Sequence, residues 1–185
     1  MLKTEIREKM KNTRNNLSKE QIKIKSNIII NTLKDKLASN YKIYFIYYDF
    51  NNEVCTKHLI NYLLENNKKV FLPKIIEDEM YAVPFDKQST LSLNKFKIYE
   101  PNGSPQKINN FVCIMPLLAV DTKGNRIGFG KGYYDKFLKN KNCLKIGLCY
   151  DFQILDNIVT ENHDIPIDII ISESRIIYTQ QKKNL

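Results

Sequence analysis

Tryptophan is absent from this 185-residue chain, and glycine, cysteine and arginine are scarce. The four cysteines (Cys55, Cys113, Cys143 and Cys149) show no C-x-x-C spacing, and two lie in apolar, strand-like runs. Buried free thiols are therefore expected, and neither disulfides nor a zinc site. Apolar runs are far too short to span a membrane, and charges begin at Lys3, which argues against a signal peptide. We expect a cytoplasmic protein with no membrane partner.

The net charge of +9 raises the question of a nucleic-acid partner, although arginine contributes little to it. Lysine carries the excess, and the lysines are scattered over expected helices and loops without forming one stripe. Heavy use of Asn and Ile points to a compositional bias of the gene. Nucleic acid is therefore not expected as a partner, although a basic binding module stays open as an alternative.

The length fits one domain, residues 1–185, that can bury a sizeable core. Apolar spacing predicts a helix at 3–17 and, after a capping box at 18–21, a second helix to about 38. A strand, helix and strand follow, which is typical of a parallel α/β unit. The further elements expected are strand 43–48, helix 56–65, strand 69–72 ended by Pro73, strand 80–83, a turn at 100–103 in an irregular stretch 77–110, strand 111–115, helix 134–140, and strands 144–149, 168–171 and 175–178.

Four of the six glycines gather in one stretch, Gly124-Asn-Arg-Ile-Gly-Phe-Gly-Lys-Gly-Tyr-Tyr-Asp135. Such glycine spacing suits neither helix nor strand and lets a ligand approach the main chain. Exposed N–H groups, with Arg126 and Lys131 inside the same flexible segment, predict a cradle for an anion such as phosphate. A tight turn without a ligand is the alternative. The Walker and dinucleotide patterns do not fit, because Asn125 and Tyr133 stand where they need glycine.

Other polar residues lie close to expected strand ends, where ligands collect in open α/β sheets. Glu53 follows the first strand, and Asp164 lies in the loop before the last two. Asp135 also fits a plain charge at a helix N-terminus, and Asp164 also fits a turn former. Lys3 and Arg7, four apart, share one face of the first helix, and their spacing alone favours a solvated surface.

The run from Pro116 to Asp135 (PLLAVDTKGNRIGFGKGYYD) resembles the signature of the 5-formyltetrahydrofolate cyclo-ligases, also called methenyltetrahydrofolate synthetases. Leu117 and Val120 depart from the usual Gly and Phe of that signature. The resemblance covers nearly the whole chain. The weaker landmarks, in the family's order, are Lys3 with Arg7, Glu53-Val-Cys-Thr56, Leu72-Pro73, Tyr99-Glu100-Pro101 and His163-Asp164-Ile-Pro-Ile-Asp168.

The resemblance implies a single-domain, three-layer Rossmann-like sheet with helices on both faces, an architecture shared with sugar-phosphate and coenzyme A enzymes. It implies an ATP- and magnesium-dependent closure of 5-formyltetrahydrofolate to 5,10-methenyltetrahydrofolate, with release of ADP and phosphate. Phosphoryl transfer to the formyl oxygen makes that oxygen a good leaving group. This chemistry needs positioning and charge neutralisation, and it requires no nucleophilic side chain.

The roles implied by the resemblance overlap in the glycine-rich loop. The catalytic residues are Arg126 and Lys131, and the magnesium ligands are Asp135 and Asp164. ATP binding falls to Lys3, Arg7, Arg126, Ile127, Gly128, Phe129, Gly130, Lys131, Gly132, Tyr133 and Tyr134. Folate binding falls to Tyr48, Glu53, Phe129, Gly130, Lys131, Gly132 and Tyr133.

Some alternatives stay open beside these roles. At least one of Tyr133 and Tyr134 is expected to be a core aromatic, and His163 is expected to be a structural hydrogen-bonding residue. The chain is expected to act as a monomer on ATP and the folate. A sugar-phosphate or coenzyme A handling protein of the same architecture is the competing enzyme hypothesis, because fold does not fix function.

Overall fold

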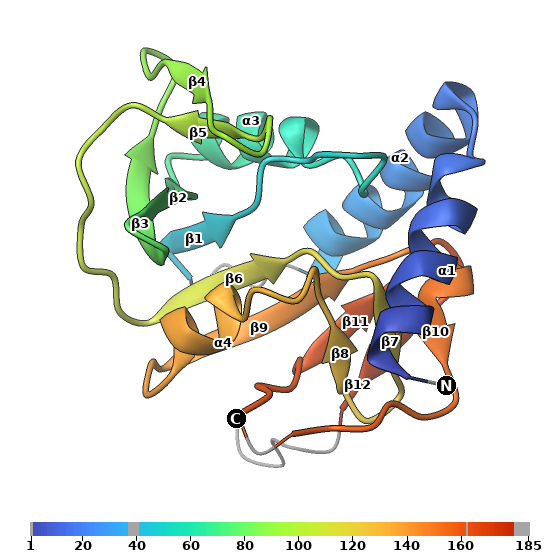
Figure 1. The fold of residues 1–185 in the computed structure, drawn as a ribbon. Coiled ribbons are helices and arrows are strands. Elements are labelled where there is room, and N and C mark those ends of the chain that lie inside the picture. The colour runs from blue at the N-terminus through green and yellow to red at the C-terminus, as the bar shows by residue number, and fades with distance from the viewer. Residues whose placement is uncertain (1, 37–40, 162, 180–185) are drawn as a thin grey trace.

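A seven-stranded sheet runs through the computed structural model, which describes residues 2–36, 41–161 and 163–179 (Figure 1). In chain order its strands are β1 (Ile43–Ile46), β2 (Lys69–Ile76), β3 (Glu79–Phe85), β6 (Phe111–Met115), β9 (Cys143–Leu148), β11 (Ile169–Ile171) and β12 (Ile176–Tyr178). Their spatial order is β12-β11-β9-β6-β1-β2-β3. The five inner strands are parallel, and the two edge strands are antiparallel to their neighbours. The predicted parallel α/β unit is thus confirmed.

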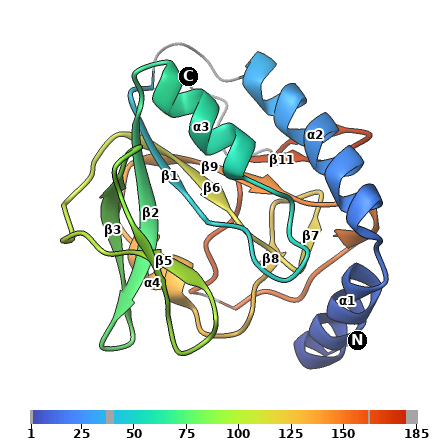
Figure 2. The same ribbon diagram turned by 90° about the horizontal axis from the view of Figure 1, so that it is seen from above.

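Helices α2 (Lys19–Lys36) and α3 (Lys57–Glu65) cover one face of this sheet (Figure 2). Their apolar residues, such as Leu33 and Leu59, pack with the strands in one core cluster. The predicted capping box opens α2, because the Gln21 N–H donates to Ser18 Oγ and the Ser18 N–H donates to Gln21 Oε1. The predicted end of this helix near residue 38 lies outside the described residues. Within the described ranges, no helix is long and apolar enough to cross a membrane.

The opposite face carries the short helix α4 (Tyr133–Leu138) and several loops. Phe137 of α4 packs against Phe45 of the inner strand β1, with ring centroids 4.6 Å apart. Buried residues from the loops, such as Ile108 and Ile167, complete this second core cluster. The predicted fold class, an α/β sheet with helices on both faces, is therefore confirmed.

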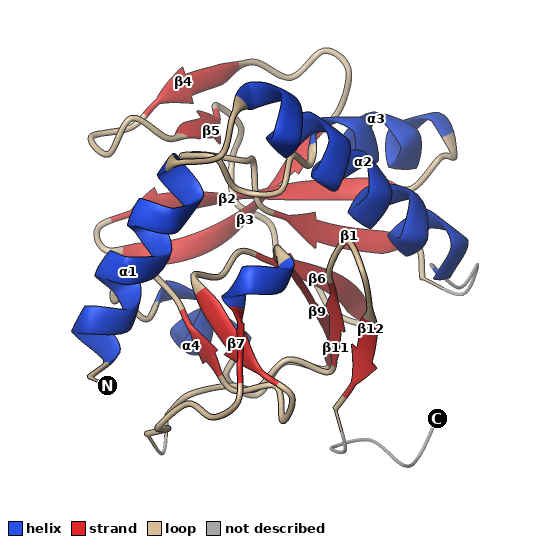
Figure 3. Ribbon diagram, turned by 90° about the vertical axis from the view of Figure 1, so that its right-hand side faces the viewer, coloured by secondary structure: helices blue, strands red, loops and turns tan. Residues whose placement is uncertain are grey.

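Helix α1 (Lys3–Asn15) lies against a small sheet of β7 (Ala119–Asp121), β8 (Arg126–Ile127) and β10 (Ile154–Leu155) (Figures 1 and 3). Ile6 and Met10 of α1 are buried there. The buried Asp121 carboxylate accepts N–H groups of the β7–β8 turn and of Ile158. Gly124 closes this turn at φ +88°, where a Cβ would lie 2.3 Å from the Ile167 oxygen. The start of the glycine-rich stretch is therefore rigid.

Pro73 does not end the second strand, contrary to the sequence prediction. Strand β2 continues to Ile76, and Pro73 lies opposite Ala82 of β3. Proline is tolerated in a sheet where its missing N–H has no strand to face. Ile75 lies two residues after Pro73, so its N–H points to the same edge of β2, and it donates to the Glu100 side chain. Strand β1 pairs only with the first half of β2. The Pro73 nitrogen thus faces an edge without a neighbouring strand.

A two-stranded ribbon, β4 (Leu91–Leu93) and β5 (Tyr99–Pro101), lies where the sequence predicts irregular chain. It stands above the edge of the large sheet, with β5 in contact with β2 and β3 (Figure 3). The turn predicted at 100–103 is wrong in its first half, because Glu100 and Pro101 pair with β4 and the chain bends only at 102–103. Strands of three residues are too short to show the alternation that identifies strands in a sequence.

The thiols follow the sequence expectation in part. Cys113, Cys143 and Cys149 are buried, and Cys55 is half-buried. Cys55, Cys113 and Cys149 are free thiols, and burial raises the pKa of Cys113 and Cys149 well above the usual range of a thiol. These buried thiols are therefore packing residues and not nucleophiles.

Candidate active site

A cavity of about 630 Å³ opens at the carboxyl ends of β1, β2 and β6. Its walls come from α1, the β4–β5 ribbon, β8, the glycine-rich loop, the start of α4 and residues Glu161, His163 and Asp164. Its size is that of a small-molecule site, and its place is where open α/β sheets bind ligands. The structure places every residue with a predicted site role in the lining of this one cavity: Lys3, Arg7, Tyr48, Glu53, Arg126, Ile127, Gly128, Phe129, Gly130, Lys131, Gly132, Tyr133, Tyr134, Asp135 and Asp164.

The glycine-rich loop begins after Ile127, later than the sequence predicts. Arg126 and Ile127 are buried in strand β8, so Arg126 is not in a flexible segment. Gly130 and Gly132 have φ of +96° and +64°, a region that favours glycine. In the described part of the chain, the backbone N–H groups of 128–132 donate to no other group. The loop therefore presents several free donors to the cavity, as a phosphate cradle requires.

The two catalytic candidates differ in mobility. Arg126 is held by an ion pair in which its Nη2 lies 2.8 Å from Asp135 Oδ1, and its guanidinium lies over the Tyr134 ring. Its buried Nε has no hydrogen-bond partner among the described residues. Lys131 is exposed on the loop and makes no ion pair with a described residue. Arg126 is thus a fixed charge, whereas the Lys131 side chain is free to follow a ligand.

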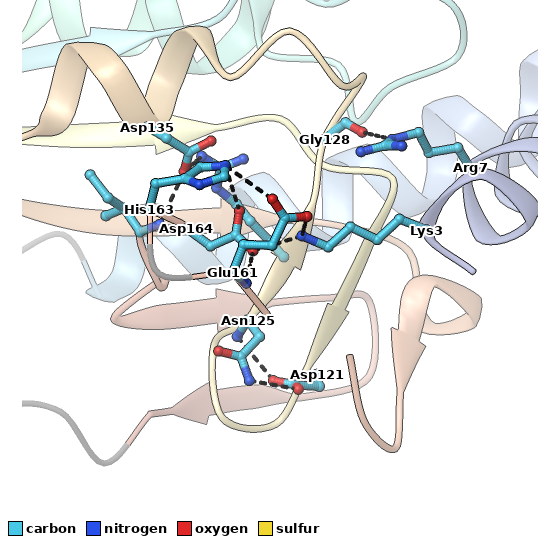
Figure 4. Close-up of polar contacts among 11 residues, drawn as sticks. Lys3, Arg7, Asp121, Asn125, Gly128, Asp135, Glu161, His163 and Asp164 are labelled. Carbon is cyan, nitrogen blue, oxygen red and sulfur yellow. Dashed lines mark hydrogen bonds and ion pairs between the residues drawn. The ribbon is translucent and has the colours of Figure 1, made fainter. Parts of the chain in front are cut away.

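Lys3 and Arg7 do not form the solvated surface that their spacing alone favours. The Lys3 ammonium lies 2.8 Å from Asp164 and 2.9 Å from Glu161, and the Arg7 Nε–H donates to the Gly128 carbonyl (Figure 4). Helix α1 packs its apolar face on the small sheet, and this packing turns both cations toward the cavity. The N-terminal helix therefore supplies positive charge to the wall beside the glycine-rich loop.

Both candidate metal ligands are ordered by hydrogen bonds. Asp135, in the first turn of α4, accepts Arg126 Nη2–H and the Ile165 N–H on Oδ1. Asp164 accepts the Lys3 ammonium and the Glu161 N–H on Oδ2 (Figure 4). Burial raises the pKa of Asp164, but these hydrogen bonds outweigh burial and hold it below its usual value. Asp164 is thus held as a carboxylate, and Asp135 is fixed in place by its two N–H donors.

The second oxygens of these carboxylates could serve as ligands of a magnesium ion, and Asp164 Oδ1 also lies 3.9 Å from His163 Nε2. Within the described ranges, Asp135 Oδ2 and Asp164 Oδ1 accept no hydrogen bond. Magnesium commonly takes one or two carboxylates together with phosphate oxygens of a substrate. The same ranges hold no cluster of three or more metal-binding side chains, so any ion here would need other ligands, such as phosphate and water.

Two of the folate candidates, Tyr48 and Glu53, come from the segment that follows β1, and the others lie in the glycine-rich loop and at the start of α4. Tyr48 is half-buried and meets Tyr99 of the ribbon edge to face, with centroids 5.9 Å apart. Glu53 is buried, and its Oε2 accepts the Phe50 N–H. Burial raises the pKa of Glu53 to about 7, although the charge of Arg14 and the Phe50 N–H act in the opposite direction. A buried carboxyl of this kind can hydrogen-bond the N–H groups of a flat heterocycle.

Glu53 should make the stability of the free protein depend on pH. Its pKa rises on folding from the usual 4.5 to about 7, so between these values the folded state binds the proton more tightly. The free energy of unfolding should therefore fall as pH rises through this window, by up to about 1.4 kcal/mol per pH unit. Glu53→Gln should lose this slope in denaturant unfolding between about pH 5 and 8, whereas exposed Glu65→Gln should keep it. An unchanged slope in Glu53→Gln would contradict the assignment.

The tyrosines of the signature separate as the sequence predicts. Tyr134 packs beside Phe45 in the second core cluster, with a buried hydroxyl that has no partner among the described residues. Tyr133 is half-buried, and its hydroxyl lies 3.4 Å from Asp78. His163 is exposed at the cavity mouth beside Glu161 and is not the structural hydrogen-bonding residue expected, since its only contacts with described residues are long ion-pair distances of 3.5 and 3.9 Å.

Arg14 and the residues around the β4–β5 ribbon are among the cavity residues that were not predicted from the sequence. Arg14 is 2% exposed and lies 3.9 Å from Glu53. Its signal was present, because Ile6, Met10 and Arg14 step by four and so place an arginine on the buried face of α1. The residues of the β4–β5 ribbon and its connecting turn show no periodic pattern, although Tyr99 and Glu100 belong to a landmark of the family resemblance; those that line the cavity are Asn94, Phe96, Ile98, Tyr99 and Glu100.

Together, the sheet, the cavity at its carboxyl end and the cationic glycine-rich loop define an α/β protein with a candidate site for a small molecule. The model of the 5-formyltetrahydrofolate cyclo-ligase family matches residues 1–173. The chain therefore belongs to the 5-formyltetrahydrofolate cyclo-ligase family, which is a family of enzymes.

Individual relatives agree with this assignment. The chain is 34% identical to the 5-formyltetrahydrofolate cyclo-ligase of Haemophilus influenzae, over 77% of this chain and 80% of that one. It is 36% identical to a probable 5-formyltetrahydrofolate cyclo-ligase of Schizosaccharomyces pombe, over 68% and 71% of the two chains. The solved structure of the 5,10-methenyltetrahydrofolate synthetase of Aquifex aeolicus superimposes with a TM-score of 0.85 at 32% identity, over 100% and 96% of the two chains.

Proposed function

We propose that this protein closes 5-formyltetrahydrofolate to 5,10-methenyltetrahydrofolate, using ATP and magnesium and releasing ADP and phosphate. One observation carries the proposal. The cations, the free loop N–H groups and the buried Glu53 line one cavity in a chain of the cyclo-ligase family. A phosphate-binding wall and a wall suited to a heterocycle are what a reaction between ATP and a folate needs.

The formyl oxygen is a poor leaving group until it is phosphorylated. In the proposed reaction this oxygen attacks the terminal phosphorus of ATP, and the bond to ADP breaks. The neighbouring folate nitrogen then attacks the formyl carbon and loses its proton, and the carbon–oxygen bond breaks to release phosphate. Both ring nitrogens then share the methenyl carbon, and no oxidant or reductant is needed.

The chain's own groups act by position and charge. The loop N–H groups and Lys131 would bind the phosphates, and Lys3 and Arg7 would cover the nucleotide. Arg126 would face the transferred group as a fixed cation, oriented by Asp135. Asp135 and Asp164 would hold magnesium, whose chemistry when bound is to neutralise phosphate charge. Glu53 and Tyr48 would orient the folate so that its formyl oxygen meets the loop.

The direct test is the ATP-dependent rise of methenyl absorbance with 5-formyltetrahydrofolate, with ADP measured in parallel. We expect one ADP for each methenyl product and no rise without ATP or magnesium. No absorbance change with all components present would contradict the proposal. Salt-sensitive binding of random RNA would instead favour the nucleic-acid alternative. We further propose that the enzyme works in the cytoplasm and that it is a monomer. Sedimentation at working concentration tests the monomeric state.

A branched side chain at Gly130 should impair ATP binding. Gly130 has φ of +96°, and a Cβ there would lie 3.4 Å from the Arg7 guanidinium carbon. Gly130→Val should therefore strain the loop and obstruct phosphate approach, lowering ATP affinity by at least about tenfold. Asn140→Val is the control, since Asn140 also has positive φ but lies outside the cavity wall. Unchanged nucleotide affinity in folded Gly130→Val, measured by calorimetry, would contradict the cradle.

A further inference from the structure

Arg14 is an unusual residue in helix α1 because its charge is buried. It is 2% exposed and follows Ile6 and Met10 on the face that packs into the protein. It also lines the cavity, and its buried Nε has no hydrogen-bond partner among the described residues. An arginine buried in this way costs free energy unless its surroundings or a ligand compensate. Its position therefore points to a role in the site.

Two contacts connect Arg14 to two different segments of the cavity wall. Its Nη1 lies 3.9 Å from Glu53 Oε1, and its guanidinium carbon lies 5.6 Å from the centre of the Phe129 ring. Glu53 belongs to the folate side, and Phe129 belongs to the glycine-rich loop. The Asn52 side chain also donates to the Arg14 carbonyl, at 3.4 Å, which ties the end of α1 to the segment that carries Glu53.

We propose that Arg14 is a positioning residue, which holds the Glu53 carboxylate on the folate side and supports the glycine-rich loop through Phe129. The identity of the bound heterocycle rests on the proposed function. Arg14 acts through these two neighbours and need not touch the reacting atoms.

The charges around Glu53 make this role measurable. Arg14 faces it from α1, and Asp49, Tyr47 and the Phe50 N–H face it from the segment after β1. Burial and Asp49 favour the neutral acid, whereas Arg14 and the Phe50 N–H favour the carboxylate. Arg14 is the strongest of the groups that keep the carboxylate, so its removal should shift the titration of Glu53 to higher pH. Arginine itself stays charged throughout the working range.

The first test follows Glu53 directly and needs no activity. Carbon-13 NMR of glutamate-labelled protein can follow the Glu53 carboxyl, assigned by its loss in Glu53→Gln. We expect a midpoint near 7 in the unmodified protein, a midpoint at least about one pH unit higher in Arg14→Gln, and a smaller shift in Arg14→Lys. Lys9→Met, an exposed change on the same helix outside the cavity wall, should leave the midpoint unchanged. An unchanged midpoint in Arg14→Gln would overturn the proposal.

The second test asks whether Arg14 acts through Glu53. Arg14→Gln should raise KM for 5-formyltetrahydrofolate by about tenfold at neutral pH and change KM for ATP much less. The same change in a Glu53→Gln background should add little, because the carboxylate that it positions is gone. The double variant leaves neither charge buried alone, so it stays informative if Arg14→Gln does not fold. If the effects of Arg14→Gln and Glu53→Gln on KM were fully additive, the proposal would be overturned. If all the proteins, the unmodified one included, lacked activity while Arg14→Gln still shifted the Glu53 midpoint, only the proposed function would be contradicted.

Discussion

Asp135→Asn is expected to slow turnover by roughly 10²-fold or more and to raise the magnesium concentration needed for half-maximal rate. Asn keeps an oxygen for the Arg126 and Ile165 hydrogen bonds, so the fold should survive. It removes a proposed anionic ligand of the metal ion, and the charge stabilisation that a metal ion gives to the transition state is on the order of several kcal/mol. A role limited to the start of α4 would predict a much smaller loss, about 0.3–1 kcal/mol of stability.

Asp164→Asn should behave in the same way, because Asp164 is held by Lys3 as Asp135 is held by Arg126. The double variant should be far less impaired than the product of the two single effects, since in the proposed site both residues act on one ion. Turnover is measured against magnesium concentration for all three variants, with exposed Asp156→Asn as the control. A near-normal rate in either single variant at limiting magnesium would remove that residue from the metal site.

Lys131→Met is expected to lower kcat by about 10²- to 10³-fold, the usual cost of losing one donor to a developing charge. Lys131 is exposed and forms no ion pair with a described residue, so the free energy of unfolding should hardly change. Lys136→Met removes an equally exposed charge outside the cavity wall and should leave kcat near normal. A single-turnover measurement separates phosphoryl transfer from product release. Equal rates in the two variants would exclude Lys131 from catalysis.

The parts of the fold that the sequence predicted are those with long or fully apolar patterns. The strand Phe111–Met115 was predicted with its observed bounds because all five residues are buried. Pro73 was misleading, because whether proline ends a strand depends on which edge its nitrogen faces, and that depends on tertiary neighbours. The β4–β5 ribbon was not predicted, because its strands are too short to show the alternation of apolar and polar residues.

The site was predictable where residue type and spacing carry the chemistry. The glycine-rich loop has that property, since glycines and cations adjacent in the chain are adjacent in space. The pairing of Lys3 with Asp164 joins residues at opposite ends of the chain, and only the packing of α1 on the small sheet brings them together. Arg14 was not singled out in the sequence, although it continues the four-residue spacing of Ile6 and Met10 on the buried face of α1.

The central claim is that ATP phosphorylates the formyl oxygen in this cavity. The most direct measurement uses 5-formyltetrahydrofolate labelled with oxygen-18 in the formyl group and follows the label by mass spectrometry of the phosphate released. The proposed reaction predicts that the labelled oxygen leaves in phosphate, one atom for each methenyl product. Unlabelled phosphate, with the label in water, would contradict it, because the formyl oxygen would then have left without ever being bonded to phosphorus.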